Sequence, residues 1–75
     1  MSTRFFPVIL RSGENGKYIA ECPSISGCMT QGDTLESALA NIKEAIELCI
    51  EDMQERGEPL PVPSTALLSE VAVEV

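Results

Sequence analysis

The fold is decided by residues 18–39, which read YIAECPSISGCMTQGDTLESAL. The β-forming run Lys17–Cys22 predicts a strand, and the turn-forming residues that begin at Pro23 end it. A second, shorter strand is expected at Cys28–Gln31, where Gly32 stops it. A helix start follows at once, so this stretch predicts two strands and then a helix.

The helix has a clear beginning, an apolar face and an end. Either Asp33 or Thr34 can cap it, and Asp33 with Glu36 has the spacing of a capping box. Arg56 and Gly57 are typical of a helix end, where a cation and a left-handed residue are favoured. Apolar residues recur between these ends at alternating four- and three-residue steps, which places them on one face. This apolar stripe consists of Leu35, Leu39, Ile42, Ile46, Cys49 and Met53.

A first strand is expected upstream, at Phe5–Leu10, and the turn residues Ser12–Gly16 would fold it back on the next strand. Pro7 has no N–H, so the regular ladder is expected to start after it or to bulge there. Three strands joined by short links predict an antiparallel meander.

Downstream of the helix, the alternating prolines of Glu58–Pro63 predict a stiff, extended strap that returns the chain across the fold. The last residues, Glu70–Val75, alternate between polar or small residues and valine, which predicts a closing strand with the valines on one face. If this strand runs parallel to the first, a right-handed crossover is expected. The predicted fold class is α+β, with the order β-β-β-α-β in one domain of residues 1–75.

The first strand is apolar on both sides. Phe6, Val8 and Leu10 point one way, and Phe5 and Ile9 point the other. One helix can cover only one face of a sheet, so the other face would be an exposed apolar patch unless a second subunit covers it. The sequence therefore predicts a homodimer or higher oligomer that associates through Phe5 and Ile9.

Composition narrows the possible functions. The chain has 75 residues, 44% hydrophobic and 23% charged, which indicates one small globular domain. A domain of this size buries only about 60% of its unfolded surface. Twelve acidic residues against five basic ones give a formal charge of −7, which disfavours direct nucleic-acid binding and favours a basic partner.

The three cysteines, Cys22, Cys28 and Cys49, are odd in number and do not predict a disulfide scaffold. A metal site of three thiolates and a carboxylate is the alternative to buried structural thiols, which we favour. No secretory signal and no membrane span is recognised, so a cytoplasmic protein with reduced thiols is expected. We expect no metal and no cofactor.

Enzymatic activity is not expected. The chain has no histidine, and therefore no histidine base or imidazole ligand. The predicted first strand carries no carboxylate, and Cys22 or Cys28 would lack an activating partner as a nucleophile.

Acidic residues gather on the helix face opposite the apolar stripe. They can form either a solvated outer face or an acidic ridge on which a basic protein docks. A pair between Asp52 and Arg56 would add minor support at i,i+4 spacing. The candidate partner-binding residues are Glu44, Glu47, Glu51, Glu55 and Glu58.

The quoted stretch resembles the HicB antitoxin family. The matching pieces are the strand that ends in Cys22-Pro23, the Gly27-Cys28 pair, the Gly32-Asp33-Thr34 helix start, and Gly57-Glu58-Pro59-Leu60-Pro61-Val62-Pro63. The resemblance covers nearly the whole chain. It implies a partial RNase H-like domain that lacks the nuclease carboxylates.

The resemblance also implies a function in a type II toxin–antitoxin pair. The expected partner is a small basic HicA-like toxin that cleaves mRNA, and the antitoxin would mask its active face. Many HicB-like proteins carry a C-terminal DNA-binding module, and we expect none within residues 1–75. Two alternatives stay open: an orphan oligomeric module without a toxin, and an enzyme with a degenerate RNase H-like site.

Overall fold

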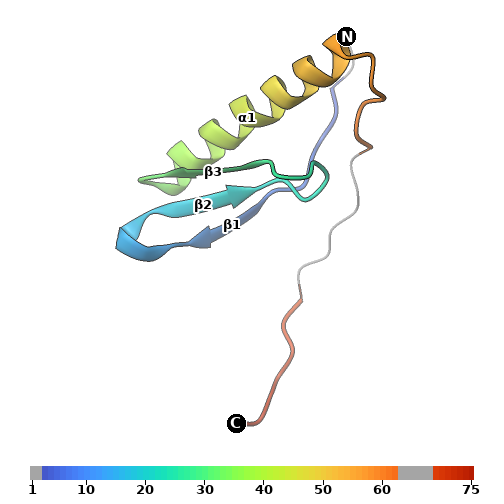
Figure 1. Ribbon diagram of the computed structural model, residues 1–75. Helices are drawn as coiled ribbons and strands as arrows, with labels where there is room; N and C mark the ends of the chain where they lie inside the picture. The colour runs from blue at the N-terminus through green and yellow to red at the C-terminus, as the bar shows by residue number, and fades with distance from the viewer. Residues whose placement is uncertain (1–2, 63–68) are drawn as a thin grey trace.

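The computed structural model describes residues 3–62 and 69–75. It confirms an α+β arrangement of three antiparallel strands and one helix that packs on the sheet (Figure 1). In chain order, the elements are β1 (Ile9–Ser12), the single turn η1 (Glu14–Gly16), β2 (Tyr18–Glu21), β3 (Met29–Gly32) and α1 (Leu35–Glu55).

The sheet is a meander in the order β1-β2-β3, as predicted. Leu10 pairs with Ala20, and Ala20 pairs with Thr30, so these three side chains share the face toward α1. The strand β1 begins at Ile9 and not at Phe5, and Pro7 gives the reason, because it cannot donate to the ladder.

Two tight connections hold the meander. Asn15 and Gly16 of η1 have φ of 64° and 71°, the left-handed region that Asn and Gly tolerate best. Between β2 and β3, the N–H of Cys22 donates to the carbonyl of Cys28 over 3.0 Å, and Gly27 has φ of 76°. The loop thereby turns Ile25 inward, where it is buried.

Both ends of α1 have local hydrogen-bonded caps. The Thr34 side chain accepts from the N–H of Ser37, and the Ser37 hydroxyl accepts from the N–H of Thr34, each over 3.0 Å. Thr34 is therefore the cap, with Ser37 as its partner in place of the expected Glu36. At the other end, Glu58 N–H donates to Met53 and Gly57 N–H to Gln54, as in a Schellman motif.

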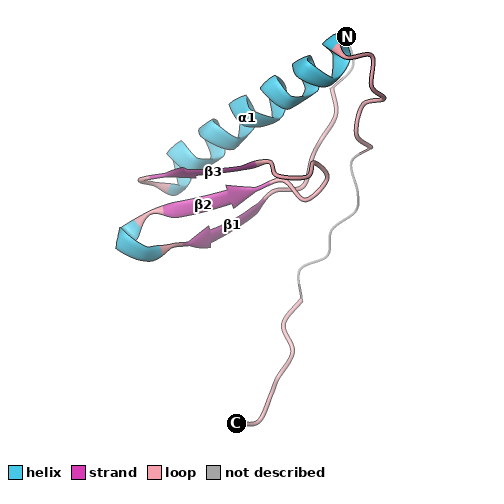
Figure 2. Cartoon of the chain, in the orientation of Figure 1, coloured by secondary structure: helices cyan, strands magenta, loops and turns pink. Residues whose placement is uncertain are grey.

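Figure 2 shows α1 lying over the sheet. The core between them is small. The helix packs mainly against β3 and less against β2. The predicted stripe is only partly buried: Ile42 and Ile46 lie in the core, whereas Leu35 and Leu39 are nearly half exposed. Ala38 lies in the core beside Gly32 and lets the helix approach β3 closely, which turns Leu39 toward the flank. The buried residues are Ala20, Cys22, Ile25, Cys28, Ala38, Ile42 and Ile46.

The closing strand predicted for Glu70–Val75 does not form within the described chain. Residues 69–75 have no regular secondary structure, and Val71, Val73 and Val75 are exposed. The segment leads away from the sheet, so it has no strand beside it with which to form a ladder (Figure 1). Pro63, the last residue of the predicted strap, lies outside the described residues.

Candidate functional site

The helix α1 has an acidic face. Glu44, Glu47, Glu51 and Glu55 recur at three- and four-residue steps, on the side opposite the buried Ile42 and Ile46, and all four are exposed. Glu58 does not continue this face, because α1 ends at Glu55 and the chain turns at Gly57, whose φ is 70°. We call the four helical glutamates the acidic face.

No basic side chain of the described residues pairs with the acidic face. Among residues 3–62 and 69–75, none of its four glutamates forms an ion pair. The nearby cation Arg56 pairs instead with Asp52 over 2.7 Å, as its spacing predicted, and with Glu58 over 3.3 Å. The negative field of the face is therefore free to act on a partner.

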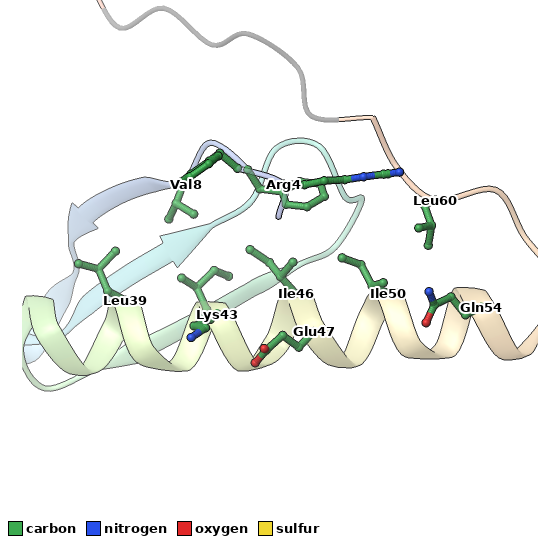
Figure 3. A pocket seen from close by; sticks show the side chains of 12 residues that line it. Arg4, Val8, Leu39, Lys43, Ile46, Glu47, Ile50, Gln54 and Leu60 are labelled. Atoms are coloured by element: carbon green, nitrogen blue, oxygen red, sulfur yellow. The ribbon is translucent and has the colours of Figure 1, made fainter. Parts of the chain in front are cut away.

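A groove runs along one flank of α1, and sequence reasoning missed it. Its volume is about 650 Å³. One wall is the N-terminal segment that precedes β1, and the other is the helix flank, with Leu60 closing one end (Figure 3). The apolar lining residues are Phe5, Phe6, Val8, Leu39, Ile42, Ile46, Ile50 and Leu60.

Two of the five basic residues of the chain also line the groove. Arg4 comes from the N-terminal segment and Lys43 from α1, and in the described part of the chain neither forms an ion pair. Glu47 lines the same rim, so the acidic face and the groove adjoin there. Lys43 and Ile50 lie beside the predicted stripe, and their position there is the signal that could have indicated the groove.

The outer face of the sheet is partly apolar. Ile9 is 39% exposed and Met29 is 49% exposed, and both lie on the face that α1 does not cover. Arg11 and Glu21 share this face and approach to 3.7 Å. Phe5 is 85% exposed but lines the groove, so the structure does not bring Phe5 and Ile9 to one surface.

The three cysteines lie close together at the core. Burial is the main cause that raises the pKa of the Cys28 thiol from 9.0 to about 11, and nearby Cys49 and Cys22 contribute. All three are free thiols. Within the described ranges, no group of three or more His, Cys, Asp or Glu side chains has the arrangement of a metal site. This cluster has the character of a structural core.

Comparison with known proteins gives one consistent result. Residues 6–73 match the HicB-like antitoxins of bacterial toxin–antitoxin systems. A UPF0150 protein of Synechocystis sp. is 46% identical over 56 residues, which cover 75% of this chain and 71% of that protein. A UPF0150 protein of Thermoplasma acidophilum is 43% identical over 56 residues, which cover 75% of this chain and 81% of that protein.

A third similar protein comes from a virus. It is an uncharacterized 14.9 kDa protein of Haemophilus phage HP1, and it is 41% identical over 56 residues. These residues cover 75% of this chain and 41% of the phage protein. Separately, the helix in the described residues is not apolar enough to cross a membrane.

Proposed function

The chain belongs to the HicB-like antitoxin family of bacterial toxin–antitoxin systems, and from this premise we propose that it neutralises a small basic toxin of the HicA type. The toxin would be an mRNA-cleaving enzyme, and the antitoxin would cover its active face. Neutralisation is then steric and electrostatic.

The acidic face of α1 is the observation that carries this proposal. Four exposed glutamates on one side of a rigid 21-residue helix form no ion pair with the described residues. A toxin that binds RNA needs a basic surface for the phosphates. A rigid row of carboxylates can occupy that surface in place of the RNA backbone.

The charge of the whole chain supports the same partner. A formal charge of −7 attracts a basic protein at a distance and speeds the encounter. The same charge repels RNA, so the antitoxin itself would not compete for the substrate of the toxin.

We propose that the chain has no catalytic activity of its own. Family membership suggests a non-catalytic protein. The chain also lacks histidine, and the Cys28 thiol is a poor nucleophile because its pKa is raised to about 11.

The proposal includes the fold-level relation that the sequence resemblance implies. Three antiparallel strands followed by a helix, the order seen here, support a partial RNase H-like domain. Residues 70–75, from the same chain or from a second copy, would supply the fourth strand of such a domain.

The test begins with capture of the partner. The tagged chain is isolated from its native lysate, and a small basic protein that copurifies in near-stoichiometric amount is identified by mass spectrometry. That protein is then assayed for RNA cleavage with and without the chain. We expect cleavage that the chain suppresses; a partner without RNA cleavage activity, or one that the chain does not inhibit, would contradict the proposal.

A matched pair of variants tests the acidic face. E51K reverses a charge at the centre of the face, and E14K makes the same change in the β1–β2 turn, where Glu14 is also exposed. We expect E51K to weaken toxin binding at least tenfold and E14K to change it little. Equal effects would show that only net charge matters and not this face.

An orphan module without a toxin is the second candidate function. The partly exposed Ile9 and Met29 on the outer sheet face favour it, because a self-associating scaffold needs such a surface. Capture of the bait alone, in a sample where the bait is folded and abundant, would support this alternative.

A further inference from the structure

The strand β1 has a free edge. In the described part of the chain it pairs with β2 alone, so its other side carries backbone N–H and C=O groups without a ladder partner. Such an edge is a template for another strand. It lies next to the groove, because Val8, the residue before β1, lines that groove.

The space below this edge is apolar and open. Because α1 packs on β3 and β2, its far flank, with Leu39 and Ile50, overhangs the β1 side without a strand beneath it. Leu39 is 46% exposed there. A fourth strand beside β1 would place its inward side chains against this flank and complete the layer under the helix.

The chain also carries a segment of the matching kind. Val71, Val73 and Val75 alternate with Glu70, Ala72 and Glu74, and the three valines are at least 73% exposed. Six residues with valines on one side have the sequence pattern of an edge strand, although they pair with no strand here. No other described segment outside the sheet has this pattern.

Charge favours this segment as the occupant. Arg11 lies on the outer face of β1. A strand with its valines toward α1 would place Glu70 and Glu74 on that outer face, where cross-strand pairs with Arg11 are within reach.

We propose that residues 70–75 of a second copy fill the groove, as a strand added to β1, and that the exchange is reciprocal. In its own chain the segment leads away from the sheet (Figure 1). A two-fold exchange satisfies both vacant edges and both valine rows at once, and it closes without further growth. This inference does not depend on a toxin.

The first test measures the molecular mass in solution by light scattering after size-exclusion chromatography. The protein concentration is about 10–100 μM, because a dimer with a Kd of about 1 μM is then mostly associated. We expect a dimer for the full chain and a monomer for a chain that stops after residue 68. V73D should also give a monomer, whereas A72S, on the opposite side of the segment, should remain a dimer. A monomeric full chain would overturn the proposal, as would a truncated chain that stays dimeric.

A second test separates exchange from association through the outer sheet face. I9K introduces a charge on that face but leaves the β1 edge and the valines intact. Reciprocal exchange predicts that I9K stays dimeric while V73D does not. The reverse result would assign the dimer to the outer face and overturn the exchange.

Crosslinking distinguishes a second copy from the same chain. In a C49S background, R11C and A72C are made as separate proteins, mixed after unfolding and refolding, and oxidised. Exchange predicts a covalent dimer that contains one chain of each variant; Q31C, on the far strand β3, replaces R11C as the control and should give none. If only a double variant R11C/A72C crosslinks, and does so within one chain, the segment closes its own groove and the proposal fails.

Discussion

Gly32 shows how one missing side chain positions the helix. A Cβ at this position would lie 2.5 Å from the N of Ala38 and 2.8 Å from the backbone carbon of Ser37, and it would also clash with the Ser37 hydroxyl. These contacts are with the first turn of α1, so the glycine is needed for the close approach of helix and strand.

We therefore expect G32A to destabilise the protein by about 1–3 kcal/mol, because an overpacked contact with backbone must shift the helix. Urea unfolding followed by circular dichroism measures this change. The control is Q31A, an exposed neighbour on the same strand, which should stay within about 0.5 kcal/mol of the original protein. Equal stability of G32A and the original protein would show that the contact relaxes freely.

Cys28 gives the protein a pH dependence in the alkaline range. Burial and the neighbouring thiols Cys49 and Cys22 raise its pKa from 9.0 to about 11 in the folded state. Between these values the unfolded chain loses the thiol proton and the folded chain retains it. Stability contributed by this proton is complete below pH 9 and declines as the pH rises toward 11.

We expect the free energy of unfolding to fall from about pH 9 to pH 11 more steeply in the original protein than in C28A. Urea unfolding at several pH values measures both slopes, so that any loss of packing in C28A is separated from its pH dependence. Parallel slopes would contradict a raised pKa at Cys28.

At the scale of the element, α1 depends on its first turn. The reciprocal bonds of Thr34 and Ser37 satisfy two N–H groups that would otherwise lack a partner. T34A should therefore cost about 1 kcal/mol in the free energy of unfolding, and T34S, which keeps the hydroxyl, should cost much less. Thermal and urea unfolding of both variants test this, and similar losses in T34A and T34S would indicate that the methyl group of Thr34 matters and not its bond.

The elements themselves were largely predictable, because their signals are local. The turn at Asn15-Gly16 and the Schellman end at Gly57 follow from left-handed backbone that few residues tolerate. The late start of β1, at Ile9, agrees with the expectation that the regular ladder begins after Pro7, which has no N–H to donate. Thr34 and not Asp33 is the cap because Ser37 supplies the reciprocal bond, a partner that the Asp33–Glu36 spacing did not indicate.

For the candidate site too, the part that depends on local sequence was predictable and the part that depends on tertiary packing was not. The acidic face follows from spacing on one helix, so Glu44, Glu47, Glu51 and Glu55 were found from the sequence. The groove joins the N-terminal segment to the flank of α1, and it depends on the roll of the helix toward β3. The position of Lys43 and Ile50 beside the apolar stripe indicates only the helix wall of the groove. No local pattern places the N-terminal segment opposite it, which is why Arg4 and Lys43 were not predicted as neighbours.

At the scale of the whole molecule, the surfaces that lack a partner have different characters. The acidic face is charged and rigid, which suits a basic protein, whereas the groove and the valine segment are apolar and match each other. A dimer formed through the groove leaves most of α1's acidic face exposed on each copy. Self-association and partner binding are therefore compatible, although Glu47 lies at the rim that both surfaces share.

The excess of negative charge should also make folding stability depend on salt. Glu47, Glu51 and Glu55 follow one another at i,i+4 spacing, where like charges repel, and the chain as a whole carries −7. Salt shortens the range of this repulsion to about 10 Å at 0.1 M. We expect the melting temperature to rise by a few degrees between about 0.01 M and 0.5 M sodium chloride.

The triple variant E47Q/E51Q/E55Q, which removes the like charges along α1, tests whether that rise comes from the acidic face. Each substitution removes one negative charge, so the formal charge changes from −7 to −4 while the buried core stays the same. The melting temperature of this variant should depend on salt much less than that of the original protein. Because salt also strengthens apolar burial, both proteins are compared in chloride and in an equal concentration of a neutral osmolyte, which leaves the repulsion unscreened. If the two proteins respond alike to chloride, repulsion along α1 does not limit the stability of the fold, and the acidic face carries no folding cost that a basic partner could relieve.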